Sequence, residues 1–518
     1  MRARLSAPSP RWSILAAISS AGAIIALSVV YYYVFGEYRR DSDQVNTFLM
    51  AQDIVNGNLF GHHWWISDDN FWFLDVSFEA LLIALLGVHP KVMVIAPASM
   101  WAVVVVMSAL ACVREKDWSL AGLLVVLTLL GLPILRQNDA MQLMGRSPIH
   151  VASTICMLAM MLLAARLMKA GSRPALITVI GLITALGTSS DPLIMVIGSG
   201  AIVIVAGLDA LGGVRRQHVV VLATIIGATL AGRIGISVAQ KLGGLSAYHL
   251  PLRFVELKDL GANLWLGLFS LLTLTGTNFF GRTVPHALPF VVRLPFLGML
   301  IWALVFTGTR YAHNLTAFGL YRRLKPLDRI LLVAVLINAA AGLLSELLHG
   351  PAESRYFYPA LVFGAILCAR VMPNLRWLNS VAGAAFACSL VFTVRDYVRT
   401  PPTVVVLEPS VTQLADRLIS EHLTLGYASY WSASVTTAAS RNQVAVRAVE
   451  TNNAGRIVPK LWNSKSDWYE NFGGSRPFFV LADKRDIEAR LSGKMIVGTF
   501  GEPTSRISLQ DFNVLVYR

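Results

Sequence analysis

The sequence predicts a polytopic α-helical membrane protein that carries a small α/β soluble domain at its C-terminal end. Of the 518 residues, 55% are hydrophobic and only 14% are charged, whereas soluble domains average about 25% charged residues. Uncharged runs such as 12–33 and 92–113 exceed the roughly 18 residues that a bilayer crossing needs. After Arg395, polar residues occur throughout and the apolar runs shorten. We therefore expect a transmembrane domain, residues 1–395, and a soluble domain, residues 396–518.

The basic residues predict the orientation of the crossings. Lys and Arg outnumber Asp and Glu by 44 to 30, for a net charge of +14. They lie in short clusters between apolar runs, as in the cytoplasmic loops of membrane proteins, so the positive charge does not indicate a nucleic-acid partner. The basic N-terminus is expected in the cytoplasm, because the first run is too long for a cleaved signal peptide and ends in Tyr31–Tyr33.

About eleven crossings then alternate correctly between the basic clusters and put the C-terminal domain outside, in the periplasm of a bacterial inner membrane. Segments 78–86 and 264–280 are too short or marginal, so we expect them to lie in the outer interface. The expected crossings are residues 12–34, 92–113, 118–135, 149–168, 174–188, 193–211, 218–238, 290–308, 330–348, 357–372 and 377–394.

The region after Pro401 and Pro402 alternates strand-length apolar runs with helical patterns, which is typical of an α/β domain. The expected strands are 403–407, 443–449, 477–481, 494–500 and 512–517, and the expected helices are 411–421 and 484–491.

The first outward loop concentrates side chains that can do chemistry. Seven acids and two histidines occur between Asp41 and Glu79, mixed with tryptophans, in a chain that is otherwise poor in acids. Carboxylates can bind a metal ion or accept a proton, and the tryptophans offer surfaces on which a sugar can stack. A solvated interfacial loop with an aromatic belt is the alternative interpretation. The candidates in this loop are Asp41, Asp43, Asp68 and Asp69.

Three other outward segments carry candidate groups. Arg146 and His150 open the fourth crossing and suit a phosphate or a metal ion. Asp191 is a costly acid at the membrane rim, although an Asp before Pro is often only turn chemistry. Arg355 at a helix start can hold a phosphate or can merely snorkel to the interface.

The sequence lacks the motifs of nucleotide chemistry. It has no Walker loop and no GxGxxG segment followed by an acid, and its four cysteines show no metal-binding spacing. A transferred group would therefore come from elsewhere, and a lipid-carried substrate can supply it from within the membrane.

These residues together resemble the GT-C superfamily of integral membrane glycosyltransferases, which use polyprenyl-phosphate sugars. The likeness covers residues 1 to about 395 and includes uncharacterised bacterial members that have an outer C-terminal domain. The chain has no Trp-Trp-Asp segment of the oligosaccharyltransferase kind, which argues against en bloc transfer to protein. The motifs that carry the resemblance are Asp41–Asp43, Gln52–Asn58, Ser67–Trp72, Ala84–Gly87, Glu353–Pro359 and, in the soluble part, Gly426–Trp431.

The resemblance implies inverting transfer of a sugar from a polyprenyl-phosphate donor to a glycan, lipid or protein acceptor. Asp43 or Asp41 would be the base, and a divalent ion (Mg²⁺, Mn²⁺ or Zn²⁺), with Asp43 and His150 as candidate ligands, or nearby cations would stabilise the departing phosphate. A lipid-linked sugar flippase, a secondary transporter or a polysaccharide polymerase stays open as an alternative. The expected substrate-binding residues are Asp68, Asp69, Arg146, His150, Asp191, Glu353, Arg355 and Tyr356, and the expected acceptor-stacking residues are Trp431, Trp462 and Trp468, for which a buried core position is the alternative.

Overall fold

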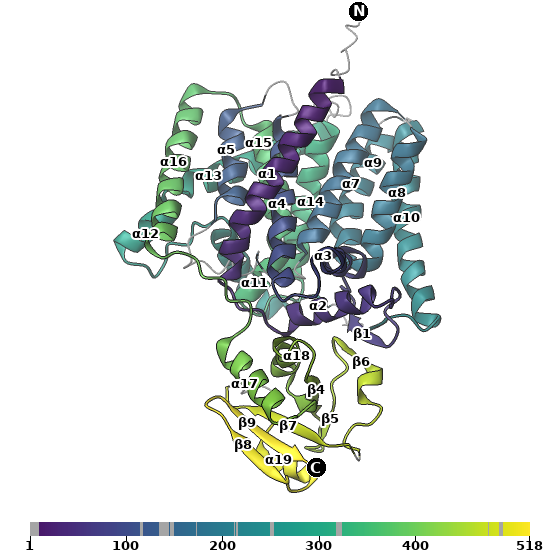
Figure 1. The fold of residues 1–518 in the computed structure, drawn as a ribbon. Helices are drawn as coiled ribbons and strands as arrows, with labels where there is room; N and C mark the ends of the chain where they lie inside the picture. The colour runs from purple at the N-terminus through teal and green to yellow at the C-terminus, as the bar shows by residue number, and fades with distance from the viewer. Residues whose placement is uncertain are drawn as a thin grey trace, which may run out of the picture.

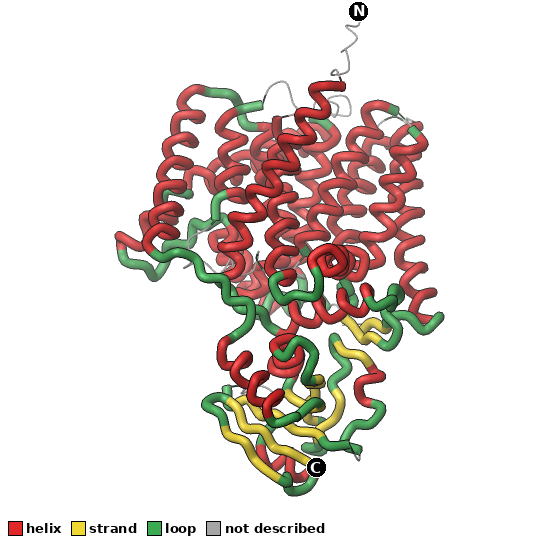
Figure 2. Tube along the Cα trace, in the orientation of Figure 1, coloured by secondary structure: helices red, strands yellow, loops and turns green. Residues whose placement is uncertain are grey.

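The computed structural model shows a bundle of roughly parallel and antiparallel helices with the C-terminal domain at one end (Figures 1 and 2). Helix α1 begins at the opposite end of the bundle and runs toward that domain (Figure 1). The residues that the structure describes are 10–113, 118–133, 145, 150–171, 173–211, 213, 216–248, 253–316, 324–474, 476–485 and 491–518.

The chain is a polytopic helical membrane protein, and a helix occurs at each of the expected crossings. Within the described residues, eight helical stretches are long and apolar enough to cross a membrane, whereas those at α5, α8 and α15 are shorter. The helices are α1 (Pro10–Gly36), α4 (Val92–Val113), α5 (Leu120–Val126, extended by a π-helical turn over Leu127–Gly131), α7 (Val151–Ala170), α8 (Pro174–Ser190), α9 (Gly200–Leu211, preceded by a π-helical turn over Ile194–Ser199), α10 (Arg216–Lys241), α12 (Val284–Val291), α13 (Leu294–Thr316), α14 (Pro326–Leu344), α15 (Tyr358–Val371) and α16 (Arg376–Arg399).

Shorter helices lie at the end of the bundle that faces the C-terminal domain (Figure 1). Two of them, α3 (Ser77–Leu86) and α11 (Leu260–Leu274), fall on the segments expected in the interface, and α3 is seen end-on, so it runs across the bundle. Between α1 and α3 the chain forms α2 (Ser42–Val55), the strand β1 (Trp64–Ser67) and a π-helical turn over Trp72–Val76. The first outward loop is therefore folded structure.

The C-terminal region is an α/β domain, as the sequence predicts. Its six-stranded sheet has the order β5-β4-β3-β7-β9-β8, in which β3 runs parallel to β4 and β7 while the outer pairs are antiparallel. The strands are β3 (Leu425–Ala428), β4 (Ala445–Thr451), β5 (Ile457–Pro459), β7 (Phe478–Asp483), β8 (Ser505–Ser508) and β9 (Phe512–Tyr517), and the helices are α17 (Pro409–Ser420), α18 (Tyr430–Ala439) and α19 (Gly493–Phe500).

Two of the expected strands in this domain are wrong. Segment 494–500 is the helix α19, because the Ser492 side chain accepts a hydrogen bond from the backbone of Met495 and so caps a helix start. Segment 403–407 lies outside the sheet, because it bonds instead to the end of α1 and the residues that follow: the Val405 amide donates to the Gly36 carbonyl at 2.7 Å, and the Arg40 amide donates to the Val406 carbonyl at 2.9 Å. The expected helix 484–491 falls largely outside the described residues.

Close packing around Gly426 in the central strand β3 gives a stability prediction. A Cβ atom on Gly426 would lie 2.3 Å from the ring of Phe479, which is fully buried. Gly426→Ala is therefore expected to lower the free energy of unfolding by about 1–3 kcal/mol. Gly498→Ala on α19 is the control, because a Cβ there meets nothing within 4 Å and alanine favours a helix. The measurement is thermal unfolding of both variants. A melting temperature of Gly426→Ala equal to that of the wild type would contradict the prediction.

The two parts of the chain share a hydrophobic core. Val45 and Phe48 of α2 belong to the same buried cluster as Leu414 of α17 and Phe479 of β7. A three-stranded sheet of order β2-β1-β6 also joins them: β1 pairs in parallel with β2 (Ser246–Tyr248) and antiparallel with β6 (Ser464–Lys465) of the C-terminal region. The C-terminal domain therefore docks on the end of the bundle through apolar packing and backbone pairing.

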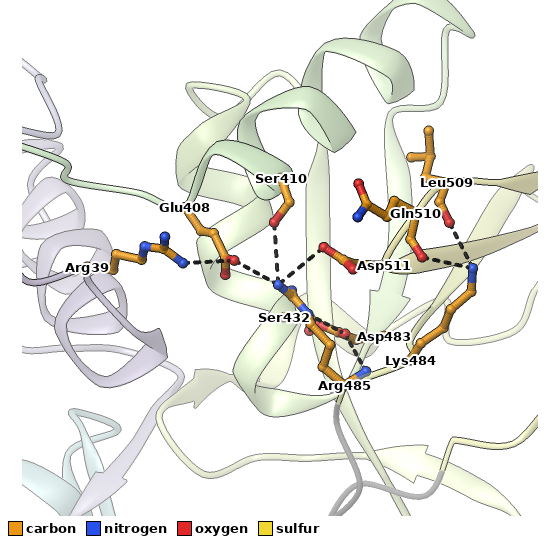
Figure 3. A network of polar contacts seen from close by, with 10 residues as sticks. All are labelled: Arg39, Glu408, Ser410, Ser432, Asp483, Lys484, Arg485, Leu509, Gln510 and Asp511. Atoms are coloured by element: carbon orange, nitrogen blue, oxygen red, sulfur yellow. Dashed lines mark hydrogen bonds and ion pairs between the residues drawn. The ribbon is translucent and has the colours of Figure 1, made fainter.

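A surface network of charges adds to this junction (Figure 3). Arg39, just before α2, lies 3.0 Å from Glu408, which also pairs with Arg485 at 2.8 Å, and Arg485 in turn pairs with Asp483 at 2.9 Å. Exposed pairs of this kind contribute at most about 1 kcal/mol each, so the shared core carries most of the docking energy.

Candidate functional site

A cavity of about 240 Å³ lies where the bundle meets the C-terminal domain. Its wall combines residues of α2, of the loop after β1, of the start of α7, of a 3₁₀ helix over Pro351–Phe357 and of the chain before β6. The lining residues are Asp43, Thr47, Met50, Ile66, Ser67, Asp69, Asn70, Phe71, His150, Arg355, Tyr356, Trp462 and Asn463. Six residues expected at the site from the sequence, Trp462 among them, thus converge on one cavity.

Asp43 lies in the first turn of α2 and is held from the C-terminal domain. The Tyr430 hydroxyl donates a hydrogen bond to Asp43 Oδ1 at 2.5 Å, and the same hydroxyl accepts from the Asn463 side chain at 3.1 Å. Burial, together with the neighbouring Asp43 charge, raises the pKa of Tyr430 well above its usual value. Tyr430 therefore keeps its proton and remains a fixed donor to Asp43.

Asp41 has a different place from Asp43. It is the N-cap of α2: its side chain accepts from the Asp43 amide at 3.1 Å, and the Gln44 side chain accepts from the Asp41 amide at 3.2 Å. This reciprocal pair is a capping box. Because Asp41 does not line the cavity, its position explains the start of α2, and Asp43 is the better placed of the two for chemistry.

His150 and Asp191 form a buried pair at the back of the cavity. His150 Nδ1 lies 2.8 Å from Asp191 Oδ2, and Ser153 donates to the same carboxylate oxygen. Burial alone would lower the pKa of His150, but the charge and hydrogen bond of Asp191 outweigh it and raise that pKa above its usual value. The same contacts outweigh burial for Asp191 and lower its pKa. The contact between the two side chains therefore favours an imidazolium beside a carboxylate.

The His150 ring is fixed by its neighbours as well. It packs between Phe71 and Tyr356, whose ring centroids lie 5.3 and 5.5 Å away, and its backbone adopts φ 53 at the N-cap of α7. Asp191 is fully buried and does not line the cavity. Asp191 thus orients the His150 ring through a hydrogen bond on the side away from the cavity and favours its protonated form.

Arg355 and Tyr356 enter the cavity from the 3₁₀ helix that precedes α15. The Arg355 guanidinium lies 5.2 Å from the centroid of the Tyr356 ring, a cation–π contact. Glu353 is half-buried in the same turn but does not line the cavity. With Arg355 and His150 on its wall, the cavity presents two positive groups.

Of the two adjacent acids in the first loop, the structure brings only Asp69 to the cavity. Burial, with the nearby Asp191 charge, raises the pKa of Asp69 against the opposing charge of His150. Asp68 is half-buried and lies off the cavity wall. The remaining candidate, Arg146, lies outside the described residues.

A metal ion remains a prediction. In the described part of the chain, no three side chains of His, Cys, Asp and Glu stand close enough to hold an ion together. Asp43 accepts from Tyr430 and His150 Nδ1 is bonded to Asp191, and a histidine that ligates a metal commonly bonds a carboxylate through its other ring nitrogen in this way. The chemistry proposed below does not depend on a metal.

Sequence reasoning missed the contribution of Tyr430 and Asn463 to the site. Both come from the C-terminal domain, more than 380 residues after Asp43 in the case of Tyr430. Asn463 directly precedes β6, which pairs with β1. Tyr430 begins α18, which is joined to α2 by the hydrogen bond from the Ser42 hydroxyl to the Tyr430 carbonyl. The segment Gly426–Trp431 stands out in the sequence, but nothing in it indicates its partner.

The chain is similar to known proteins in its three-dimensional structure. No family model and no curated protein sequence matches the chain. The oligosaccharyltransferase of Archaeoglobus fulgidus in its apo form is 11% identical, with a TM-score of 0.47 over 95% of this chain and 72% of that chain. Its complex with Zn and sulfate is 12% identical, with a TM-score of 0.45 over 92% and 70%.

The arabinofuranosyltransferase AftD from Mycobacteria is 14% identical, with a TM-score of 0.39 over 99% of this chain. The match spans only 40% of AftD, so this chain corresponds to less than half of that enzyme. These matched structures are an oligosaccharyltransferase and an arabinofuranosyltransferase.

Proposed function

We propose that the chain is a membrane glycosyltransferase that moves a sugar from a polyprenyl-phosphate donor to an acceptor hydroxyl, with inversion, on the outer face of a bacterial plasma membrane. The acceptor would be a glycan, lipid or protein of the cell envelope. The observation that carries the proposal is one cavity at the end of the bundle that combines the carboxylate of Asp43 with the cations of Arg355 and His150.

In this proposal Asp43 is the general base. The acceptor oxygen attacks the anomeric carbon from the face opposite the phosphate, and Asp43 accepts the hydroxyl proton as the new glycosidic bond forms. The Tyr430 hydroxyl fixes Asp43 Oδ1 in position. A general base must lie within hydrogen-bond reach of the proton that it accepts. The bond from Tyr430 and the position of Asp43 in the first turn of α2 fix where its carboxylate lies.

Arg355 and His150 stabilise the leaving group. When the bond between the anomeric carbon and the phosphate oxygen breaks, polyprenyl phosphate leaves with the electron pair and gains negative charge. Fixed positive groups aimed at such developing charge lower the barrier because they need no reorganisation. The contact with Asp191 raises the pKa of His150 and so favours its charged form. Asp69 and Tyr356 on the same wall would bind the hydroxyls and the face of the sugar.

The donor class is tested with purified protein in vesicles that contain radiolabelled polyprenyl-phosphate sugars. We expect label to move to an acceptor and the new linkage to have the anomeric configuration opposite to that of the donor. The same sugars presented as nucleotide derivatives should give no product. Transfer from the nucleotide form, or a retained configuration, would contradict the proposal.

A flippase or transporter is the rival function. Transporters place their substrate-binding ionisable groups near the middle of the membrane, whereas those of this cavity lie where the bundle meets the C-terminal domain. In the same vesicles, a donor labelled in one leaflet would distinguish the two: movement across the bilayer without glycosidic bond formation supports transport.

The His150–Asp191 pair predicts a pH dependence of transfer. The pKa of His150 is raised by Asp191, so the charged imidazolium, and with it phosphate binding, persists above the usual His value of about 6.5 and is lost as the pH rises through the raised pKa. Without the carboxylate, burial lowers that pKa. Asp191→Asn should therefore move the alkaline limb of kcat/KM toward lower pH, while an unchanged limb would show that His150 is not the titrating group.

A further inference from the structure

A second and larger cavity opens in the C-terminal domain, on the other side of Tyr430. Its volume is about 530 Å³. Its wall is formed by the start of α18, the end of β4 with the turn that follows, Lys460 and the first part of α19. The lining residues that bear on its chemistry are Tyr430, Trp431, Glu450, Asn453 and Lys460.

The aromatic wall of this cavity is open to a ligand. Trp431 is 44% exposed, and its ring stands edge-on to the Tyr430 ring, with 5.1 Å between the two centroids. Tyr430 belongs to the hydrophobic core that joins the two parts of the chain, whereas Trp431 does not. A broad aromatic face with a polar tip is the surface on which the C–H face of a sugar ring packs.

The rim of the cavity supplies polar groups. The Lys460 ammonium lies 3.1 Å from Glu450 and 5.7 Å from the centroid of the Tyr430 ring, and the exposed Asn453 belongs to the turn after β4. An acyl chain would leave these groups against hydrocarbon, which is costly. Sugar hydroxyls can both donate to the carboxylate and accept from the ammonium and amide, so the lining favours a carbohydrate.

Tyr430 connects the two cavities. Its ring belongs to the wall of the larger cavity, while its hydroxyl donates to Asp43 in the smaller one. A ligand that lies against Trp431 and Tyr430 is thus separated from Asp43 only by the Tyr430 side chain. Asp43, Tyr430 and Trp431 therefore follow one another from the smaller cavity to the larger one.

We propose that this larger cavity is a subsite for a carbohydrate acceptor, so that the protein extends or branches a glycan chain. This inference rests on the proposed function, because it names the class of acceptor to which the sugar is transferred. Trp431 is the stacking platform of the subsite, and Glu450, Lys460 and Asn453 hold the sugar hydroxyls.

The test measures binding without transfer. Fluorescently labelled full-length protein in detergent is applied to an array of immobilised oligosaccharides built from arabinose, galactose, mannose or rhamnose, with immobilised peptides and phospholipid vesicles on the same surface. We expect retention on oligosaccharides, reduced about tenfold or more by Trp431→Ala, since a tryptophan anchor dominates a small interface. Trp377→Ala is the matched control, because Trp377 is 63% exposed but lies on α16 of the bundle.

A second variant keeps the test decisive if Trp431→Ala fails to fold. Asn453→Ala changes an exposed turn outside the helices and strands and should weaken retention less than Trp431→Ala but measurably. Retention on peptides or vesicles instead of glycans, no retention on any oligosaccharide, or equal retention by wild type and both variants would overturn the subsite.

The outcome is separable from that of the proposed function. Glycan retention is read without a donor, so it can hold even if no lipid-linked sugar is ever transferred. Conversely, transfer with wild-type efficiency to a peptide or lipid, together with no glycan retention, would leave the glycosyltransferase proposal standing and remove the carbohydrate subsite.

Discussion

Asp43→Asn is expected to lower the rate of sugar transfer by about 10²–10⁴, the range that a positioned general base contributes. The amide has nearly the same shape as the carboxylate and can still meet the Tyr430 hydroxyl, which bonds Asp43 Oδ1 at 2.5 Å. It cannot accept the acceptor's proton at neutral pH. The loss should therefore fall on kcat, while the KM for the lipid-linked donor changes little. The measurement is transfer of labelled sugar in vesicles at matched protein levels.

Two comparisons make this result specific. Asp416→Asn changes an exposed carboxylate on α17 and should leave transfer unchanged. Asp41→Ala removes the side-chain cap of α2 and should lower the free energy of unfolding by about 0.5–2 kcal/mol, the usual contribution of such a cap, while transfer per folded molecule changes little. Full transfer by Asp43→Asn would remove Asp43 as the base.

Arg355→Ala should have the second-largest effect, a fall in kcat/KM of about 10²–10³, which is the cost of removing one group that stabilises developing charge. Arg355 is held on the cavity wall by Tyr356, 5.2 Å from its guanidinium, and with His150 it forms the positive side of the cavity. Arg355→Lys should recover part of the loss, since lysine keeps the charge but not the planar fork of donors.

The donor dependence of the Arg355 variants checks the role. Arg253→Ala, which removes an exposed arginine before the Phe254 bridge, is the control and should behave like the wild type. If Arg355 binds the departing phosphate, the defect should be the same for every acceptor. A defect that depends on the acceptor would place Arg355 at the other substrate.

Much of the fold follows from the sequence because long apolar runs leave a chain few options in a bilayer. Each expected crossing coincides with a helix. The segment 494–500 shows where this prediction fails. Its short apolar run suits a strand, yet the Ser492 cap and the burial of Ile496 select a helix. Short apolar segments do not distinguish the two by periodicity alone.

The site was only partly predictable. Asp43, Asp69, His150 and Arg355 stand out as ionisable groups at the rim of an apolar chain, and the structure brings them to one cavity. The sequence did not separate Asp43 from Asp41, since the difference is that one caps α2 and the other follows it. Tyr430 depends on long-range docking between domains, for which local sequence carries no signal.

The most direct test is a cryo-electron microscopy map of the Asp43→Asn variant with a polyprenyl-phosphate sugar bound. The structure predicts the phosphate beside Arg355 and His150 and the sugar between Asp69 and position 43, with the polyprenyl chain leaving along the bundle. Donor density elsewhere, for example near the middle of the bundle, would contradict the assignment of the cavity lined by Asp43, His150 and Arg355 as the active site.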